Sequence, residues 1–482
     1  MNKAGIAVSL LALASTLFAA KHVQAQTLPL LAVGTLDQSR AGSWADVSGL
    51  TYSLENGVPA NDLGGFGSAI AYASGNTFLA LPDRGPNAVE FDDAIDNTTS
   101  YVNRFHTISM NLTPNGSRVG LPFTLTPTLR TTTLLWSLTP LVYGTGDGLG
   151  VGSGAPRINN FFQHFFSARS DNFDPNHNSG DFNDARLDSE GMRVSNDGLS
   201  VFVSDEYGPY VYQFNRRTGV RIRSFKLPES FYATDLQPVG TTEIADNTSG
   251  RLANKGMEGL AITPNGKTLV GMMQASLIQD GGAKGKLLRI VTIDIASGKV
   301  IHQFGYLLTA GSGVSEICAI NNHEFLVDER DGTGREANVP PGNSTNAVVK
   351  QLFKIDLKKA IDISGLDNGS LSLAQATSDA VPKTLFLDIV KSLSAPSLGA
   401  NAFALDEIPS KIEGVAFGPD VKVGHTLVHT LWISNDNDFV QQVNDINGNP
   451  ISNPNQFFVF GFTDANMGGS KFVPQRFDRF VW

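Results

Sequence analysis

The 482-residue sequence contains a single cysteine, Cys318. One thiol cannot form an internal disulfide or a paired-cysteine zinc site, so neither kind of crosslink is available to the chain. Cys318 lies in an apolar, strand-like stretch (residues 316–320), which favours a buried thiol over a reactive nucleophile. Stability must therefore come from burial of a core, with oxygen-liganded metal as a second candidate source.

Charged residues are scarce at 17%, and 46 Asp and Glu outnumber 36 Lys and Arg, for a formal net charge of -10. A nucleic-acid-binding surface usually has a basic footprint. We therefore expect no nucleic acid among the partners of this protein.

Long apolar stretches are also rare, but residues 5–20 form one of about sixteen residues, short for the roughly twenty that span a bilayer. Lys3 precedes this stretch and Val23-Gln24-Ala25 follows it, in the small-x-small pattern of a signal-peptidase site. We interpret residues 1–25 as a cleaved export signal, with a membrane anchor as the alternative. The mature chain, residues 26–482, is then secreted or periplasmic and has no stable membrane span.

The mature region lacks apolar residues repeated at helical spacing over four turns, whereas short alternating runs bounded by turn residues are common. With 49 glycines and 23 prolines, this pattern predicts an all-β fold built from many short strands. Clear strand candidates are residues 199–203, 210–214, 268–272, 287–295 and 457–462.

A repeated unit organises the chain: Glu-Gly, a strand, a turn, a second strand and an acidic tip. Residues 188–225, 254–274 and 411–438 carry clear copies, and residues 314–332 carry a degenerate one. A fifth, beginning at residues 46–53, has Ser48 in place of the acid and is expected to reach its tip at Asp83-Arg84. Such repeats predict a single β-propeller whose innermost strands line a channel. Six blades are expected, five of them recognisable, because the mature chain exceeds five blades of about 45 residues.

Residues 27–36 resemble a strand that could complete the last blade beside the C-terminal strand. A glycine-rich stretch from Gly144 to Gly154 lacks a Gly-Lys-Ser/Thr ending and is interpreted as a surface loop. The G-x-S-x-G, HExxH and Walker motifs are missing, so the common serine-hydrolase, zinc-protease and NTPase signatures are excluded.

The acids of the repeat are the candidate functional groups. Carboxylates gathered at one end of a channel repel each other unless a cation or proton is shared, and hard oxygen ligands suit Ca²⁺ or Mg²⁺. The alternative is that each glutamate bonds only the backbone of the neighbouring blade. Candidate metal ligands are Glu190, Asp205, Glu206, Glu258, Glu316, Asp328, Glu329, Glu413 and Asp436.

Three basic residues are expected beside the acidic end of the channel: Arg84 in the LPDRGPN stretch, Lys255 three residues before Glu258, and Arg330 beside Asp328-Glu329. Cations that surround a metal site suit a phosphate or carboxylate ligand. Ordinary surface salt bridges are the alternative interpretation.

Five motifs together resemble the phytase-like, "esterase-like activity of phytase" family over roughly residues 45–440. They are LPDRGPN (81–87), DSEGM (188–192), SDEYG (204–208), NKGMEGL (254–260) and KIEG (411–414). The similarity of this family to β-propeller phytases implies an extracytoplasmic propeller and Ca²⁺-assisted hydrolysis of phosphate esters. The Asp-Asp-Pro-Ala-type segment of authentic β-propeller phytases is missing, so phytate itself is not implied.

On this resemblance Glu190, Glu258 and Glu413 are the expected catalytic residues, and Arg84, Lys255 and Arg330 bind the substrate. The expected partner is a small phosphate ester or other anionic ester, and we expect a monomer. A calcium-dependent lactonase or carboxylic esterase and a non-catalytic binding propeller of the cell envelope remain as alternatives.

Overall fold

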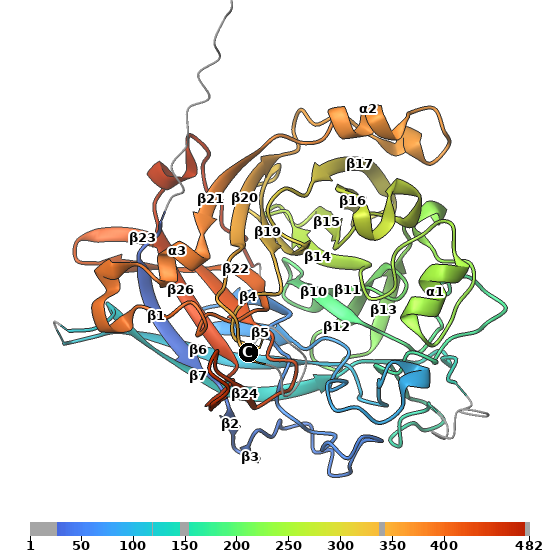
Figure 1. Cartoon of the computed structure of the whole chain (residues 1–482), viewed down its shortest axis with the longest axis horizontal. Helices are drawn as coiled ribbons and strands as arrows, with labels where there is room; N and C mark the ends of the chain where they lie inside the picture. The colour runs from blue at the N-terminus through green and yellow to red at the C-terminus, as the bar shows by residue number, and fades with distance from the viewer. Residues whose placement is uncertain (1–26, 118, 145–153, 337–342, 478–482) are drawn as a thin grey trace, which may run out of the picture.

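Five four-stranded antiparallel sheets surround a central channel (Figure 1). The structure, a computed structural model, describes residues 27–117, 119–144, 154–336 and 343–477. The proposed export signal and most of the glycine-rich stretch therefore lie outside the described residues. No helix in those described ranges has the length and apolar character needed to cross a membrane.

Each blade is given from its innermost to its outermost strand. Blade one contains β4 (Ala69–Ser74), β5 (Thr77–Leu81), β6 (Arg104–Pro114) and β7 (Phe123–Leu134). Blade two contains β10 (Ser189–Val194), β11 (Ser200–Asp205), β12 (Tyr210–Asn215) and β13 (Arg221–Phe225). Blade three contains β14 (Met257–Ile262), β15 (Thr268–Met273), β16 (Leu287–Asp294) and β17 (Val300–Leu307).

Blade four contains β18 (Gly313–Ala319), β19 (Glu324–Arg330), β20 (Lys350–Asp356) and β21 (Lys383–Asp388). Blade five contains β22 (Ile412–Val423), β23 (Thr426–Asn435), β26 (Gln456–Phe462) and β1 (Leu30–Thr35). Three two-stranded pairs lie outside the blades: β2 (Gln38–Ser39) with β3 (Gly42–Ser43), β8 (Trp136–Ser137) with β9 (His164–Phe165), and β24 (Gln442–Asn444) with β25 (Pro450–Ser452). The α-helices are short: α1 (Gly240–Asp246), α2 (Leu373–Ser378) and α3 (Ile389–Leu393).

Inner strands of the blades are largely apolar because blades pack face to face and bury both of their surfaces. Every residue of β11 and β14 is buried. The hairpin turns follow the sequence signals, since Gly198 and Gly266 adopt φ values of 72° and 69°, a backbone region that glycine reaches at little cost. Local turn chemistry and continuous apolar runs together produce the stacked hairpins.

The ring closes with five blades. The innermost strands β4, β10, β14, β18 and β22 contact one another in succession, and β22 contacts β4. The expected count of six is therefore wrong. The surplus length enters long connections at the end of the channel where the inner strands begin, including residues 36–68, 82–103, 135–188 and 226–256.

The predicted closure of the last blade is confirmed. Strand β1 pairs antiparallel with β26, with Leu30 opposite Phe460 and Thr35 opposite Gln456; in Figure 1 the blue β1 lies beside the orange β26. The placement of the first repeat at residues 46–53 is wrong, because β4 is the inner strand of blade one. Residues 46–53 belong to the preceding connection, where Asp46 pairs with the buried Arg104 at 2.5 Å.

The C-terminal segment crosses the base of the channel, opposite the long connections. Gln475 Nε2 donates hydrogen bonds to the carbonyl of Val194 (2.8 Å) and to Asn196 Oδ1 (2.7 Å). The ring of Phe472 lies 4.5 Å from that of Phe417. Cys318 lines a small cavity above this segment. Its thiol is buried, as predicted, and burial raises its pKa to about 11.

Candidate functional site

A polar cavity of about 310 Å³ opens at the end of the channel where the inner strands begin and the second strands of the blades end. We call it the mouth. Its lining residues are Asp83, Arg84, Asn87, Ala88, Glu190, Glu206, Asn254, Lys255, Glu258, Gln274, Arg330, Lys411, Glu413 and Asp438. The structure therefore brings together the three glutamates expected to be catalytic and the three expected substrate-binding cations.

Close packing of neighbouring inner strands explains the repeated Glu-Gly pair. A Cβ on Gly191 would lie 2.7 Å from the backbone nitrogen of Leu260, and one on Gly259 would lie 2.8 Å from that of Ile317. Real Cβ atoms do not approach backbone so closely, so glycine is required at these two positions. The glutamate before each glycine is thereby held at the start of its strand, facing the channel.

The first carboxylate group at the mouth consists of Asp188, Glu190 and Glu206, and we call it the blade-two cluster. One oxygen from each lies within 4.8 Å of the others. Asp188 and Glu206 are each 1% exposed, whereas Glu190 is partly exposed. Burial, and then the charge of Glu258, raise the pKa values of Glu190 and Glu206 well above the usual range of a glutamate.

The blade-two cluster has little internal charge compensation. Among the described residues, neither oxygen of Asp188 has a hydrogen-bond partner, and neither does Glu206 Oε1. The guanidinium of Arg84 approaches Asp188 Oδ2 only to 3.9 Å. Buried carboxylates without partners are costly unless protons or a cation neutralise them. The donor set, three hard oxygen ligands, fits Ca²⁺ or Mg²⁺.

The prediction of metal ligands missed Asp188. Its signal was present, because Asp188 stands two residues before Glu190 in the DSEGM motif. The backbone amide of Asp188 donates a hydrogen bond to Asp205 Oδ1 at 3.0 Å. This bond fixes Asp188 beside the end of β11.

Next to the blade-two cluster, the mouth carries Glu258 and Glu413. Gln274 Nε2 donates to Glu258 Oε2 at 2.8 Å, and burial followed by the charge of Glu413 raises the pKa of Glu258 to about 7. Glu413 is ion-paired with Arg330, whose Nε also donates to Ser315 Oγ at 2.6 Å. Arg330 therefore already has a carboxylate partner before any ligand binds.

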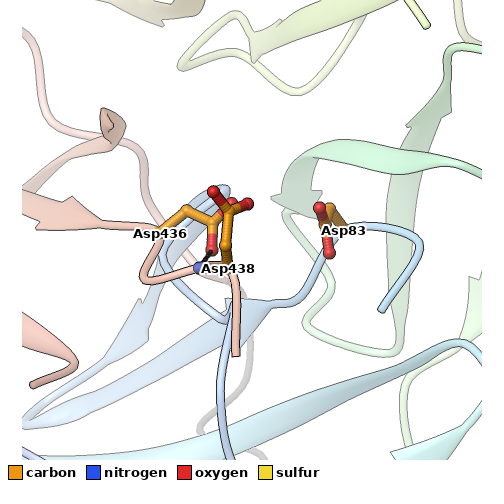
Figure 2. A group of neighbouring side chains, drawn as sticks. All are labelled: Asp83, Asp436 and Asp438. Carbon is orange, nitrogen blue, oxygen red and sulfur yellow. Dashed lines mark hydrogen bonds between the residues drawn. The ribbon is translucent and has the colours of Figure 1, made fainter. Parts of the chain in front are cut away.

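A second carboxylate group consists of Asp83, Asp436 and Asp438, with oxygens also within 4.8 Å of one another. Figure 2 shows Asp436 and Asp438 side by side on one segment and Asp83 opposite them on another. The ammonium of Lys411 binds both Asp436 and Asp438, so we call this group the Lys411 cluster. Burial opposes the charge of Lys411, but the two aspartates outweigh it and hold its pKa well above the ordinary value.

Two predicted metal ligands have complete sets of hydrogen-bond donors away from the mouth. Asp205 accepts from the backbone amides of Asp188, Tyr207 and Gly208, each at 3.0 Å. Glu329 accepts from Tyr306 Oη at 2.6 Å and from the amide of Ala310 at 2.8 Å, and pairs with Lys383. Both carboxylates stabilise loops at blade ends, and the structure does not place them with the mouth residues.

Glu316 and Asp328 also lie outside the mouth lining. Glu316 Oε2 lies 3.0 Å from Arg193 Nη2, and its Oε1 accepts from the backbone amides of Leu260 (3.0 Å) and Ile317 (2.9 Å). This residue matches the alternative interpretation, in which the acid bonds the neighbouring blade. Asp328 is fully buried and burial raises its pKa well above the usual range, which favours the neutral acid.

Arg193 fills the channel below the mouth. Its guanidinium donates to the carbonyls of Ile70 (3.1 Å), Met192 (2.6 Å), Ile317 (2.9 Å) and Val415 (3.2 Å). These carbonyls belong to the inner strands of blades one, two, four and five. One side chain thus ties four blades together, and a ligand reaches the carboxylates from the open end of the mouth.

Fold and site together define a five-bladed propeller whose mouth is lined by carboxylic acids and basic side chains. The chain belongs to the Phytase-like family, described as "Esterase-like activity of phytase", whose match covers residues 61–439. The resemblance inferred from the sequence motifs is therefore confirmed.

A relative from Arthroderma benhamiae named "Uncharacterized secreted protein" is 33% identical over 183 residues, which cover 31% of this chain and 35% of the relative. The chain therefore matches only about a third of that protein's length. Among solved structures, a luciferin-regenerating enzyme is similar with a TM-score of 0.33 and 10% identity, covering 86% of this chain and 96% of that one. Hydrazine synthase from Kuenenia stuttgartiensis gives a TM-score of 0.30 and 12% identity, covering 81% and 80%. These distant likenesses carry no argument about function.

Proposed function

We propose that this protein is an extracytoplasmic hydrolase of phosphate esters that works with a divalent cation, Ca²⁺, bound at the mouth. The observation that carries the proposal is the blade-two cluster, whose buried oxygens lack partners among the described residues. Membership of the esterase-like family supports hydrolysis. The name of the Arthroderma relative supports export.

Asp188, Glu190 and Glu206 are the residues that would hold the cation. When bound there, Ca²⁺ would offset the negative charge of a phosphate ester and lower the pKa of a water molecule. The three carboxylates lie within 4.8 Å of one another, and two of them are almost fully buried. Exclusion of water from these oxygens strengthens their attraction for a cation.

The substrate would be oriented mainly by Arg84 and Lys255. The side chain of Arg84 is 12% exposed and its link to Asp188 is long, at 3.9 Å, so its guanidinium can accept an anionic partner. Lys255 Nζ has an exposed hydrogen bond to Gln274 Oε1 at 3.1 Å. Arg330, already paired with Glu413, would instead fix the position of that carboxylate.

Glu258 is the best-placed group for proton transfer. It faces the mouth between the blade-two cluster and Glu413, and the hydrogen bond from Gln274 to its Oε2 fixes the orientation of the carboxyl group. A carboxyl group held in this way can protonate a departing alcohol oxygen or accept a proton from water. Glu190 and Glu413 stay in the proposed catalytic set, Glu190 as a ligand and Glu413 through its pair with Arg330.

A calcium-dependent lactonase or carboxylic esterase is the second candidate. The mouth lining contains six carboxylic acids, Asp83, Glu190, Glu206, Glu258, Glu413 and Asp438, against four basic side chains. A net negative cavity disfavours an anion until a cation binds, whereas a neutral ester or lactone is not repelled. The same site could therefore act on uncharged esters.

The experiment that tests the proposal measures product release from phosphomonoesters, phosphodiesters, phytate, lactones and carboxylic esters. Chelator-stripped protein is assayed with and without added Ca²⁺, and Asp188→Asn is compared with Asp356→Asn, the same substitution at an exposed aspartate at the end of β20 that lies away from the mouth. We expect Ca²⁺-dependent phosphate release that Asp188→Asn abolishes and that Asp356→Asn retains. Release from lactones or carboxylic esters alone would select the second candidate. Ca²⁺ binding without turnover of any substrate would indicate the binding propeller.

A further inference from the structure

We propose that the mouth binds one divalent cation and not two, because the Lys411 side chain occupies the second carboxylate cluster as a tethered cation. The inference rests on the proposed function, from which it takes the cation at the blade-two cluster. It adds a role for Lys411, which the sequence predictions did not assign, and a stoichiometry.

The two clusters are alike in composition and setting. Each combines three carboxylates with oxygens within 4.8 Å of one another. Each lies where a second strand of a blade ends, at Asp205 of β11 for one and at Asn435 of β23 for the other. On composition alone both would attract a cation, and the mouth would hold two.

The two clusters differ in the hydrogen bonds that their carboxylates accept. In the Lys411 cluster, Lys411 binds Asp436 and Asp438, and Asp436 Oδ1 accepts from the amide of Asp438 at 2.7 Å. Asp83 Oδ1 accepts from the amide of Gly85 at 2.8 Å. Every carboxylate of this cluster therefore has a donor.

The blade-two cluster has the opposite character. Both oxygens of Asp188 and Oε1 of Glu206 have no hydrogen-bond partner within the described part of the chain, although these residues are almost fully buried. Arg84 Nη1 lies 3.9 Å from Asp188 Oδ2, which is beyond hydrogen-bonding distance. A cation from solution is needed here to supply what Lys411 supplies in the other cluster.

The backbone holds Lys411 in position. Its carbonyl accepts a hydrogen bond from the amide of Asp436 at 3.0 Å, and β22 begins at the next residue, Ile412. The side chain therefore leaves a fixed point to reach carboxylates of the same blade. A divalent cation entering this cluster would have to displace the ammonium and would be repelled by it at short range.

This arrangement also assigns the anion-binding groups. The charge of Lys411 is neutralised by Asp436 and Asp438, so Lys411 is not available to hold a phosphate ester, although it lines the mouth. The substrate must then be held by Arg84, Lys255 and the single cation.

The test is a calorimetric titration of the chelator-stripped protein with Ca²⁺. We expect one bound ion for the wild type and one for Lys411→Arg, which retains the positive charge. Lys411→Met removes the ammonium from Asp436 and Asp438, and we expect its stoichiometry to rise to two. Two bound ions or none in the wild type, or no added ion in a folded Lys411→Met variant, would overturn the inference.

Substitutions of the acids test the same point if Lys411→Met does not fold. Asp436→Asn should leave one bound Ca²⁺, because the wild-type ion is not in that cluster, whereas Asp188→Asn should remove it. The reverse pattern refutes the assignment. Hydrolysis is measured separately: one bound Ca²⁺ without turnover refutes the enzymatic proposal only, and turnover with two bound ions refutes only the role of Lys411.

Discussion

The Arg193–Glu316 pair gives the sharpest test of how the ring is held together. Replacing Arg193 by Met keeps an unbranched side chain but removes a partner 3.0 Å from Glu316 Oε2 and the donor to four carbonyls. Coulomb's law with an effective dielectric constant of about 20 gives roughly 5.5 kcal/mol for unit charges at that separation. Breaking a buried pair on one side typically costs about 3–5 kcal/mol, and we expect a loss in that range.

The pH dependence of this loss follows from Glu316. Burial, only partly offset by Arg193, raises the pKa of Glu316 from its ordinary value to about 7. A raised acid pKa contributes stability that is present below the unfolded value and lost as pH rises through the folded one. Without Arg193, the pKa of Glu316 in the folded protein rises further. At pH 5 the variant protonates Glu316 at little cost in free energy. At pH 8 the variant must either keep an uncompensated buried charge on Glu316 or protonate it at a cost in free energy.

The assay is urea denaturation of wild type and Arg193→Met at pH 5 and pH 8, with Glu316→Gln and the double variant completing a thermodynamic cycle. We expect a larger loss of unfolding free energy at pH 8 than at pH 5, and a double variant less destabilised than the sum of the single ones. A loss below about 1 kcal/mol at both pH values would refute the view that Arg193 ties the blades together.

Three further predictions concern other parts of the fold and the mouth. Gly259→Ala places a Cβ 2.8 Å from the backbone nitrogen of Ile317 and should destabilise the protein by about 1–3 kcal/mol, measured by urea denaturation; Gly424→Ala, at an open turn, controls for added bulk but also carries the strain of a positive φ. Glu243 is 2% exposed and paired with Arg251; burial raises its pKa, but its arginine partners outweigh burial and lower it. The stabilisation from this ion pair is present above the unfolded pKa and is lost as pH falls. Glu243→Gln should therefore lower the free energy of unfolding more at pH 7 than at pH 3.5 in the same assay. Glu258→Gln should lower Ca²⁺-dependent turnover by about 10²-fold or more while thermal stability is retained, as measured by initial rates and calorimetry.

Each of these three has an outcome that contradicts it. Unchanged stability of Gly259→Ala would mean that the neighbouring inner strands can separate at no cost. An equal effect of Glu243→Gln at both pH values would show that charge does not matter at that site. Wild-type turnover in a folded Glu258→Gln variant would remove Glu258 from the proton-transfer role.

The local rules could be read from the sequence because each depends on few residues. The turn glycines Gly198 and Gly266, the strand that closes the last blade and the repeated Glu-Gly pair were all visible in this way. The blade count could not be obtained from length, since residues added to connections are indistinguishable in number from residues added to strands. The first inner strand was misplaced because the connection of residues 36–68 contains strand-like segments.

The partners of the acids were beyond the reach of sequence. Glu190 and Glu316 occupy the same place in the repeat, yet Glu316 meets Arg193 from another blade and Glu190 faces Asp188 and Glu206. Which carboxylate gains a cationic partner depends on side chains from other strands and other blades, as Arg193 of blade two meets Glu316 of blade four. The position in the repeat therefore predicts where on its strand each acidic residue lies, but it does not predict which group neutralises the charge of that residue.

The sequence by itself determined the propeller class and the end of the channel at which the acids gather, because strand alternation and turn chemistry are local. Only the tertiary structure decided that five blades close the ring, that Arg193 fills the channel, and that Lys411 binds two aspartates of one carboxylate cluster, whereas both oxygens of Asp188 in the other lack a hydrogen-bond partner among the described residues. These outcomes follow from packing and from charge compensation in a buried space. Both depend on distances between residues that the order of the chain does not specify.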